Sequence, residues 1–165
     1  FTINYKRVAT LSSGGTLAVM PPKIFFRINS MERQIKNFDY YSKFIGETGM
    51  QFSAFSTENK KYIFTMWDGY TEFLFLKLCK NPYCELPIFL KNWYEKIGWT
   101  WEDIPDKISE TEIDWVIFNL KIISDELDQK PEDIGYFDTN CIFDLIYFLE
   151  SVKELKLELE VSDDY

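Results

Sequence analysis

Short runs of alternating apolar and polar residues dominate the first half of the chain and predict β-hairpins. Residues 2–11 and 16–20 flank a Ser-Ser-Gly-Gly sequence, whose two glycines permit the positive φ that a tight turn needs. Residues 50–56 and 62–67 flank the polar segment 57–61 in the same way. We therefore expect one hairpin from each pair of runs.

The segments around these hairpins predict further elements. Residues 23–28 follow two prolines and have the apolar content of a strand. Residues 68–69, Asp-Gly, predict another turn. Residues 72–79 are so apolar that a strand and a buried helix are hard to tell apart, and their length and aromatic content favour a strand. Ser30 suits the N-cap of a helix that ends at Gly46, on the helical spacing of Ile35, Phe38, Tyr41 and Ile45.

The second half of the chain has patterns that are typical of helices. Pro87 fits the first turn of a helix that Gly98 ends. Ser109 and Glu112 form a Ser-x-x-Glu capping box at the start of a helix that runs to about residue 124. A third helix is predicted to begin near residue 138. Its buried stripe is Ile142, Leu145, Ile146, Leu149 and Val152.

Residues 155–161 alternate between aliphatic and polar side chains, which predicts a strand with one solvent-facing side. Strands early, helices late and one closing strand indicate an α+β fold. We expect a single domain over residues 1–165, with an antiparallel sheet built largely from the N-terminal hairpins. About four helices pack against this sheet, and the C-terminal strand joins it. Residues 1–19 are interpreted either as a peripheral hairpin or as a leader that is foreign to the native chain.

Composition limits where the protein works. At 165 residues with 46% hydrophobic content, the chain is long enough to bury a core of its own. No apolar run approaches the ~18 residues of a membrane span, so we expect no membrane partner. Three cysteines, Cys79, Cys84 and Cys141, form no even disulfide framework and favour a reducing compartment, the cytoplasm.

The charge of the chain is polarised along its length. The net charge is −9, yet residues 1–30 hold four basic and no acidic side chains, and residues 31–100 hold nine basic and eight acidic ones. Residues 101–165 hold 19 acidic and five basic side chains. Such a field bears on partners and solubility rather than on fold. Direct binding of DNA or RNA is not expected, because it requires Lys and Arg where this half has Asp and Glu.

Most catalytic motifs are excluded. The chain has no histidine, which removes the Ser-His-Asp, Cys-His and HExxH arrangements. Its one glycine doublet, Gly14-Gly15, lies in no phosphate-binding motif, and Cys79 and Cys84 lack the second pair of a zinc site. Residues 125–128 lack the spacing of a calcium loop. No cofactor or metal is expected, although two facing carboxylates of a hydrolase remain possible on sequence alone.

Acidic residues crowd the predicted end of the helix that begins at Glu110, where a helix dipole disfavours negative charge. Phe118 lies at the margin of an acidic stripe on the same helix, and the preceding loop carries two tryptophans. Aromatic anchors within a charged rim are typical of protein interfaces, whereas a solvated helix face is the plainer interpretation. The predicted partner-binding residues are Trp101, Glu102, Asp103, Asp106, Asp114, Phe118, Asp125, Glu126, Asp128, Glu132 and Asp133.

These observations predict a binding protein rather than an enzyme. Our first hypothesis is an inhibitor of a basic protein, such as a bacterial immunity protein or antitoxin that occludes the active site of a nuclease-like toxin. The alternatives are a DNA mimic that blocks nucleic-acid-binding enzymes, a carboxylate-dependent hydrolase, and an adaptor whose acids serve solubility alone.

Overall fold

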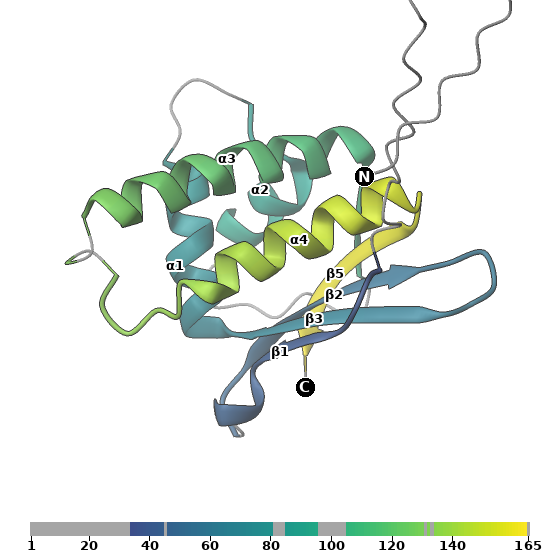
Figure 1. Cartoon of the computed structure of the whole chain (residues 1–165), viewed down its shortest axis with the longest axis horizontal. Helices are drawn as coiled ribbons and strands as arrows, with labels where there is room; N and C mark the ends of the chain where they lie inside the picture. Colours follow the sequence, from purple (N-terminus) through teal and green to yellow (C-terminus); the bar gives the residue numbers. More distant parts are fainter. Residues whose placement is uncertain are drawn as a thin grey trace, which may run out of the picture. The chain divides into compact units, whose positions relative to one another are not determined.

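A five-stranded sheet with α-helices on one of its faces forms the part of the chain that the computed structural model describes (Figure 1). The described residues are 34–44, 46–80, 85–95, 105–130, 132 and 134–164. The strands are β1 Phe38–Tyr40, β2 Gly49–Phe55, β3 Lys61–Trp67, β4 Asp106–Ile108 and β5 Glu158–Asp164. The helices within these ranges are α1 Asp68–Cys79, α2 Ile88–Glu95, α3 Glu110–Gln129 and α4 Asn140–Glu154, with a 3-10 turn η1 at Ser42–Phe44.

The sheet has the spatial order β1-β3-β2-β5-β4. Strands β2 and β3 form the second predicted hairpin, and β5 pairs antiparallel with the other edge of β2. Alternate residues of these strands point toward the helices, because successive side chains of a strand face opposite sides of the sheet. The buried side chains on this face are Met50, Phe52, Ala54, Phe64, Met66, Leu159 and Val161.

The expected α+β class, with N-terminal strands, four helices and a C-terminal strand, is confirmed in the described residues. Two details of the sheet differ from the prediction. Strand β1 runs parallel to β3, so the sheet is mixed, and the sequence pattern does not predict the three-residue strand β4. The first predicted hairpin and the strand over 23–28 lie outside the described residues, and a domain spanning all of 1–165 stays a prediction.

The predictions of a turn at 68–69 and a strand at 72–79 are wrong, because helix α1 covers both segments. Asp68 lies in the first turn of α1, where the helix dipole favours an acidic side chain. Tyr70, Leu74 and Leu78 are buried, and the other faces of α1 are also largely apolar. A helix that is hydrophobic on all sides has no amphipathic period, which is why its sequence resembles a buried strand.

The helix predicted from Ser30 to Gly46 is also wrong in the described residues, which form β1 and η1 instead. Phe38 pairs with Phe64 of β3, and this pairing overrides the helical spacing. Asp39 ends the strand, because its Oδ1 accepts hydrogen bonds from the backbone N–H groups of Tyr41 (2.9 Å) and Ser42 (2.8 Å). Gly46 has the positive φ that the prediction required, 99°, but it follows a single 3-10 turn.

Helices α2, α3 and α4 are confirmed, and the predicted end of α2 at Gly98 lies outside the described residues. The whole predicted stripe of α4 is buried. The last strand begins at Glu158 rather than at residue 155. Leu157 N–H donates to Val152 C=O and Lys156 N–H donates to Lys153 C=O, which is the hydrogen-bond pattern of a Schellman cap. Lys156 has a φ of 52° because it occupies the left-handed position of this cap. None of the described helices has the length and apolar content of a membrane span.

Candidate functional site

Helix α3 carries most of the predicted partner-binding residues, and its capping box fixes where it begins. Ser109 Oγ accepts a hydrogen bond from Glu112 N–H (3.4 Å), and Ser109 N–H donates to Glu112 Oε2 (2.8 Å). Glu112 Oε1 accepts a hydrogen bond from Ile88 N–H at the start of α2 (2.9 Å). Burial alone would raise the pKa of Glu112, but these hydrogen bonds hold it below its usual value. The predicted capping box is confirmed and also joins α2 to α3.

Helix α3 continues to Gln129, five residues beyond its predicted end. Its inward face is the one that the sequence predicts, with Ile113, Val116, Leu120 and Ile123 buried. The longer helix changes the position of the acidic residues. Asp125, Glu126 and Asp128 do not follow the helix but lie within its last two turns.

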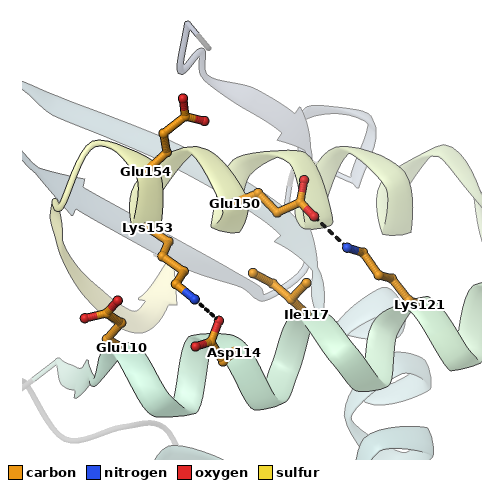
Figure 2. A pocket seen from close by; sticks show the side chains of 7 residues that line it. All are labelled: Glu110, Asp114, Ile117, Lys121, Glu150, Lys153 and Glu154. Atoms are coloured by element: carbon orange, nitrogen blue, oxygen red, sulfur yellow. Dashed lines mark hydrogen bonds and ion pairs between the residues drawn. The ribbon is translucent and has the colours of Figure 1, made fainter. Parts of the chain in front are cut away.

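The edge of α3 that faces α4 is held by two ion pairs (Figure 2). Lys121 Nζ lies 2.7 Å from Glu150 Oε1, and Lys153 of α4 donates a hydrogen bond to Asp114 Oδ1. The hydrogen bond to Asp114 raises the pKa of Lys153. Between the helices is an open groove of about 420 Å³, and Figure 2 shows Glu154 at its border pointing away from α3.

Two of the predicted partner-binding acids have partners within the described chain. The carboxylate of Asp114 pairs with Lys153 and joins α3 to α4, and the Asp114 side chain stays 52% exposed. Asp106, another predicted partner-binding residue, lies in β4 and is half-buried. Its two carboxylate oxygens accept hydrogen bonds from Asn92 Nδ2 of α2 at 3.2 and 3.0 Å. Both carboxylates therefore have structural roles.

The C-terminal end of α3 keeps its predicted acidity. Asp125, Glu126 and Asp128 are exposed, and Glu132 is exposed three residues after the helix ends. None of these four carboxylates has an ion pair or hydrogen bond with another described residue, and the last turn of α3 contains no basic side chain. Lys130, at the C-cap, is the nearest base in the sequence. We call these four residues the acidic end.

An apolar ridge on the outer face of α3 leads to the acidic end. Phe118 is 64% exposed and Ile122 is 40% exposed, and they are four residues apart and so neighbours on the helix surface. The sequence pattern predicts Phe118 but not Ile122. Ile122 lies four residues after Phe118 and is not one of the predicted inward-facing residues. This spacing is the signal that identifies it. Four predicted partner-binding residues lie outside the described residues: Trp101, Glu102, Asp103 and Asp133.

A hydrogen bond between a tyrosine and a carboxylate joins the sheet to a helix. Tyr40 Oη donates a hydrogen bond to Asp144 Oδ2 (2.6 Å), joining β1 to α4. Burial, and then this hydrogen bond, raise the pKa of Tyr40 well above its usual value. In the described ranges no group of three or more Cys, Asp or Glu side chains is arranged to hold a metal ion.

The chain matches no known family model, and no curated protein sequence or solved structure is significantly similar to it.

Proposed function

We propose that the chain is a binding protein that inhibits a basic partner by occlusion, as an immunity protein or antitoxin inhibits a nuclease-like toxin. The observation that carries this proposal is the acidic end of α3, whose carboxylates have no neutralising partner in the described chain, beside the exposed ridge of Phe118 and Ile122. The ridge supplies the apolar anchor and the acidic end supplies the charged rim.

The position of these carboxylates supports a role in binding more strongly than their number does. Two acids that lie between α3 and α4 are paired with lysines, Asp114 with Lys153 and Glu150 with Lys121. At the C-terminus of α3 the backbone carbonyls already carry partial negative charge, so each acid there costs stability. Functional sites commonly cost stability, so the placement of these acids supports a role in a bound state.

The chemistry of the surface indicates a cationic partner. A protein that binds nucleic acid in its active site presents Lys and Arg there, and the acidic end complements such a surface. Opposite charges would also speed capture, with association rates approaching ~10⁸ to 10⁹ M⁻¹s⁻¹ at low salt. A DNA mimic would share this electrostatic field but would bind several unrelated DNA-binding proteins. The carboxylate-dependent hydrolase has less support, because Asp114 and Glu150, two of the four carboxylates that line the α3–α4 groove, are held in ion pairs.

The test is a charge reversal at the acidic end. Asp125→Lys, Glu126→Lys and Asp128→Lys are combined in one variant, and co-purifying basic proteins are identified and titrated at low salt and in ~0.5 M salt. We expect the variant to fold and to lose affinity, with added salt weakening the wild-type complex because the Debye length shortens to roughly 4 to 5 Å. The control reverses three exposed acids outside the acidic end: Glu58 and Glu85, which pair with Lys60 and Lys91, and Glu95 of α2.

Two results decide between the candidates. Unchanged affinity of the variant for the captured protein, with the control variant equally unaffected, contradicts the proposal. Capture of many unrelated DNA-binding proteins favours the DNA mimic over an inhibitor of one toxin. Phe118→Ala tests the apolar anchor, and Phe143→Ala, which removes another exposed ring (51% exposed) from α4, is its control.

A further inference from the structure

Helix α3 has two faces with helical spacing, one turned into the core and one turned to solvent. The residues of the inward face are buried: Ile113, Val116, Leu120, Ile123 and Leu127. On the opposite side a second set recurs at intervals of three, four and three residues. Residues at these intervals lie on one side of a helix. We call this second set, which extends the apolar ridge at both ends, the outer strip: Trp115, Phe118, Ile122 and Asp125.

The outer strip is accessible in the described chain. Phe118 is 64% exposed, Ile122 is 40% exposed and Asp125 is exposed. Trp115 is partly exposed, and the rest of its side chain packs against the core. Figure 1 shows α3 on the side of the helical layer away from the sheet. A helix that only covers a core needs one apolar face, so the second face of α3 is not explained by the fold.

The spacing of the outer strip is that of a helix–helix seam. Trp115, Phe118, Ile122 and Asp125 occupy successive a and d positions of a heptad, where the side chains of one helix fit between those of another. The three apolar members stand at i, i+3 and i+7, which is the spacing of the anchors in helix recognition. A helix laid along α3 therefore meets all three apolar side chains at once.

The charges beside the outer strip define the partner. On the side of α4, Asp114 and Lys121 flank the strip, and both are held in the ion pairs of Figure 2. At the other end of the strip, Asp125 lies within it and Glu126 and Asp128 lie on either side. These three carboxylates are exposed and have no ion pair or hydrogen bond with another described residue. Because charges beside a seam select the partner helix, that helix should carry Lys or Arg at this end.

The same charges disfavour a second copy of the chain. In an antiparallel pair of α3 helices, the acidic end of one copy would meet the first turns of the other, which carry Glu110, Glu112 and Asp114. In a parallel pair the two acidic ends would lie side by side. Both arrangements bring like charges together across an interface, which disfavours binding. The occupant is therefore a helix of a different, basic protein.

We propose that the outer strip of α3 binds a basic amphipathic helix of the partner, which lies antiparallel to α3. The C-terminus of α3 carries partial negative charge as well as the acidic end, and the N-terminus of a helix carries partial positive charge. An antiparallel helix places its N-terminus beside the acidic end, whereas a parallel one places its negative end there. This inference rests on the proposed function in that the partner is basic, and it adds the partner's structure and orientation.

The experiment uses the full chain and three blocked peptides of about 15 residues, a length at which a free helix is marginal in water, so a gain in helicity reports binding. The heptad peptide has leucine at its a and d positions and lysine beside them. The second peptide has the same composition with its leucines at alternate positions, and in the third glutamate replaces every lysine. We expect the heptad peptide to become helical and to shift the backbone N–H signals of Phe118 and Ile122 saturably. The other two should bind about 10-fold more weakly or less.

Two variants and a spin label test the contact and its direction. Phe118→Ala and Ile122→Ala are each expected to weaken binding of the heptad peptide about 10-fold, the effect of removing an interface anchor. Phe143→Ala, which removes an exposed ring from α4, is the matched control and is expected to have no effect. A nitroxide at the N-terminus of the peptide should broaden the signals of residues 125–129, and one at its C-terminus those of residues 111–115. Dispersed spectra confirm that each variant is folded.

The outcomes separate this inference from the proposed function. If the two lysine peptides bind alike, or if Phe118→Ala and Ile122→Ala bind the heptad peptide as the wild type does, the inference is overturned, while the proposed function requires only a basic partner and stands. If the heptad peptide binds as expected and no basic protein is captured, the outer strip binds basic helices and the proposed function fails. Broadening of residues 111–115 by the N-terminal nitroxide overturns the antiparallel orientation. Signals of the outer strip that change with protein concentration alone make it a contact between copies of the chain, which overturns the inference.

Discussion

Neutralising the acidic end is expected to stabilise the free protein. The variant combines Asp125→Asn, Glu126→Gln and Asp128→Asn, which keep the shape of each side chain. Two of these acids, Glu126 and Asp128, lie in the last turn of α3, where each unfavourable interaction with the helix dipole costs about 0.3 to 1 kcal/mol. Asp125 and Asp128 are three residues apart on the helix, and their repulsion adds about 0.2 to 0.5 kcal/mol. The expected gain is therefore about 1 to 2.5 kcal/mol at low salt.

The assay is urea and thermal unfolding at pH 7 in about 0.01 M and about 1 M salt. At low salt the gain corresponds to a rise in Tm of roughly 3 to 8 °C for a domain of this size. In the higher salt the Debye length falls from about 30 Å to about 3 Å, so most of the gain disappears.

The matched control lies at the other end of the same helix. Glu110 is exposed in the first turn of α3, where the dipole favours an acid, so Glu110→Gln is expected to lower the free energy of unfolding by about 0.3 to 1 kcal/mol. If Glu110→Gln destabilises the protein while the triple variant gains nothing at low salt, the acidic end costs no stability. The main support for its role in binding would then be lost.

Three further outcomes follow from the structure. Lys156→Gly should raise stability by about 1 kcal/mol in thermal unfolding, because glycine adopts the positive φ of the Schellman cap without strain, whereas Lys156→Ala should bring no gain. The raised pKa of Tyr40 means that its contribution to the free energy of unfolding is complete below pH ~10 and is lost as the pH rises above that value. In urea unfolding across pH 9 to 11, Tyr40→Phe should therefore lose less stability than the wild type. An identical pH dependence in the two proteins would contradict this. Burial raises the pKa of the Cys141 thiol, so alkylation of Cys141 should occur only as fast as the protein unfolds. Cys79 is half-buried and should react sooner, which peptide mass spectrometry can follow.

Local signals predicted those elements whose sequence and tertiary environment agree. The capping box at Ser109 and the buried stripe of α4 each depend on residues within one helix, and both are confirmed. The β2–β3 hairpin is confirmed for the same reason, since its strands and turn are adjacent in sequence. Helix α1 failed because it is apolar on every side, so no period was present to be recognised.

Non-local pairing explains the remaining errors. Phe38 and Tyr41 have helical spacing, but β3 recruits Phe38 into a parallel strand that no local pattern reveals. At the candidate site, the sequence located the acidic end and Phe118, because those depend on positions along one helix. The sequence could not show that Lys153, 39 residues further along the chain, pairs with Asp114. It also could not show that Asn92 of α2 donates hydrogen bonds to Asp106. The stacking of Phe44 on Trp67 was not predicted, because the two rings lie in segments 23 residues apart.

The position of β5 between β2 and β4 has a consequence for synthesis of the protein. About 100 residues separate the end of β2 from the start of β5, and a ribosome adding ~5 to 20 residues per second needs roughly 5 to 20 s to supply them. During that interval one edge of the nascent hairpin has open hydrogen-bonding groups, and β4 has no strand beside it. The growing polypeptide is therefore vulnerable to wrong pairing with other emerging chains, and its yield in a cell should depend on chaperones more than the stability of the finished fold would suggest.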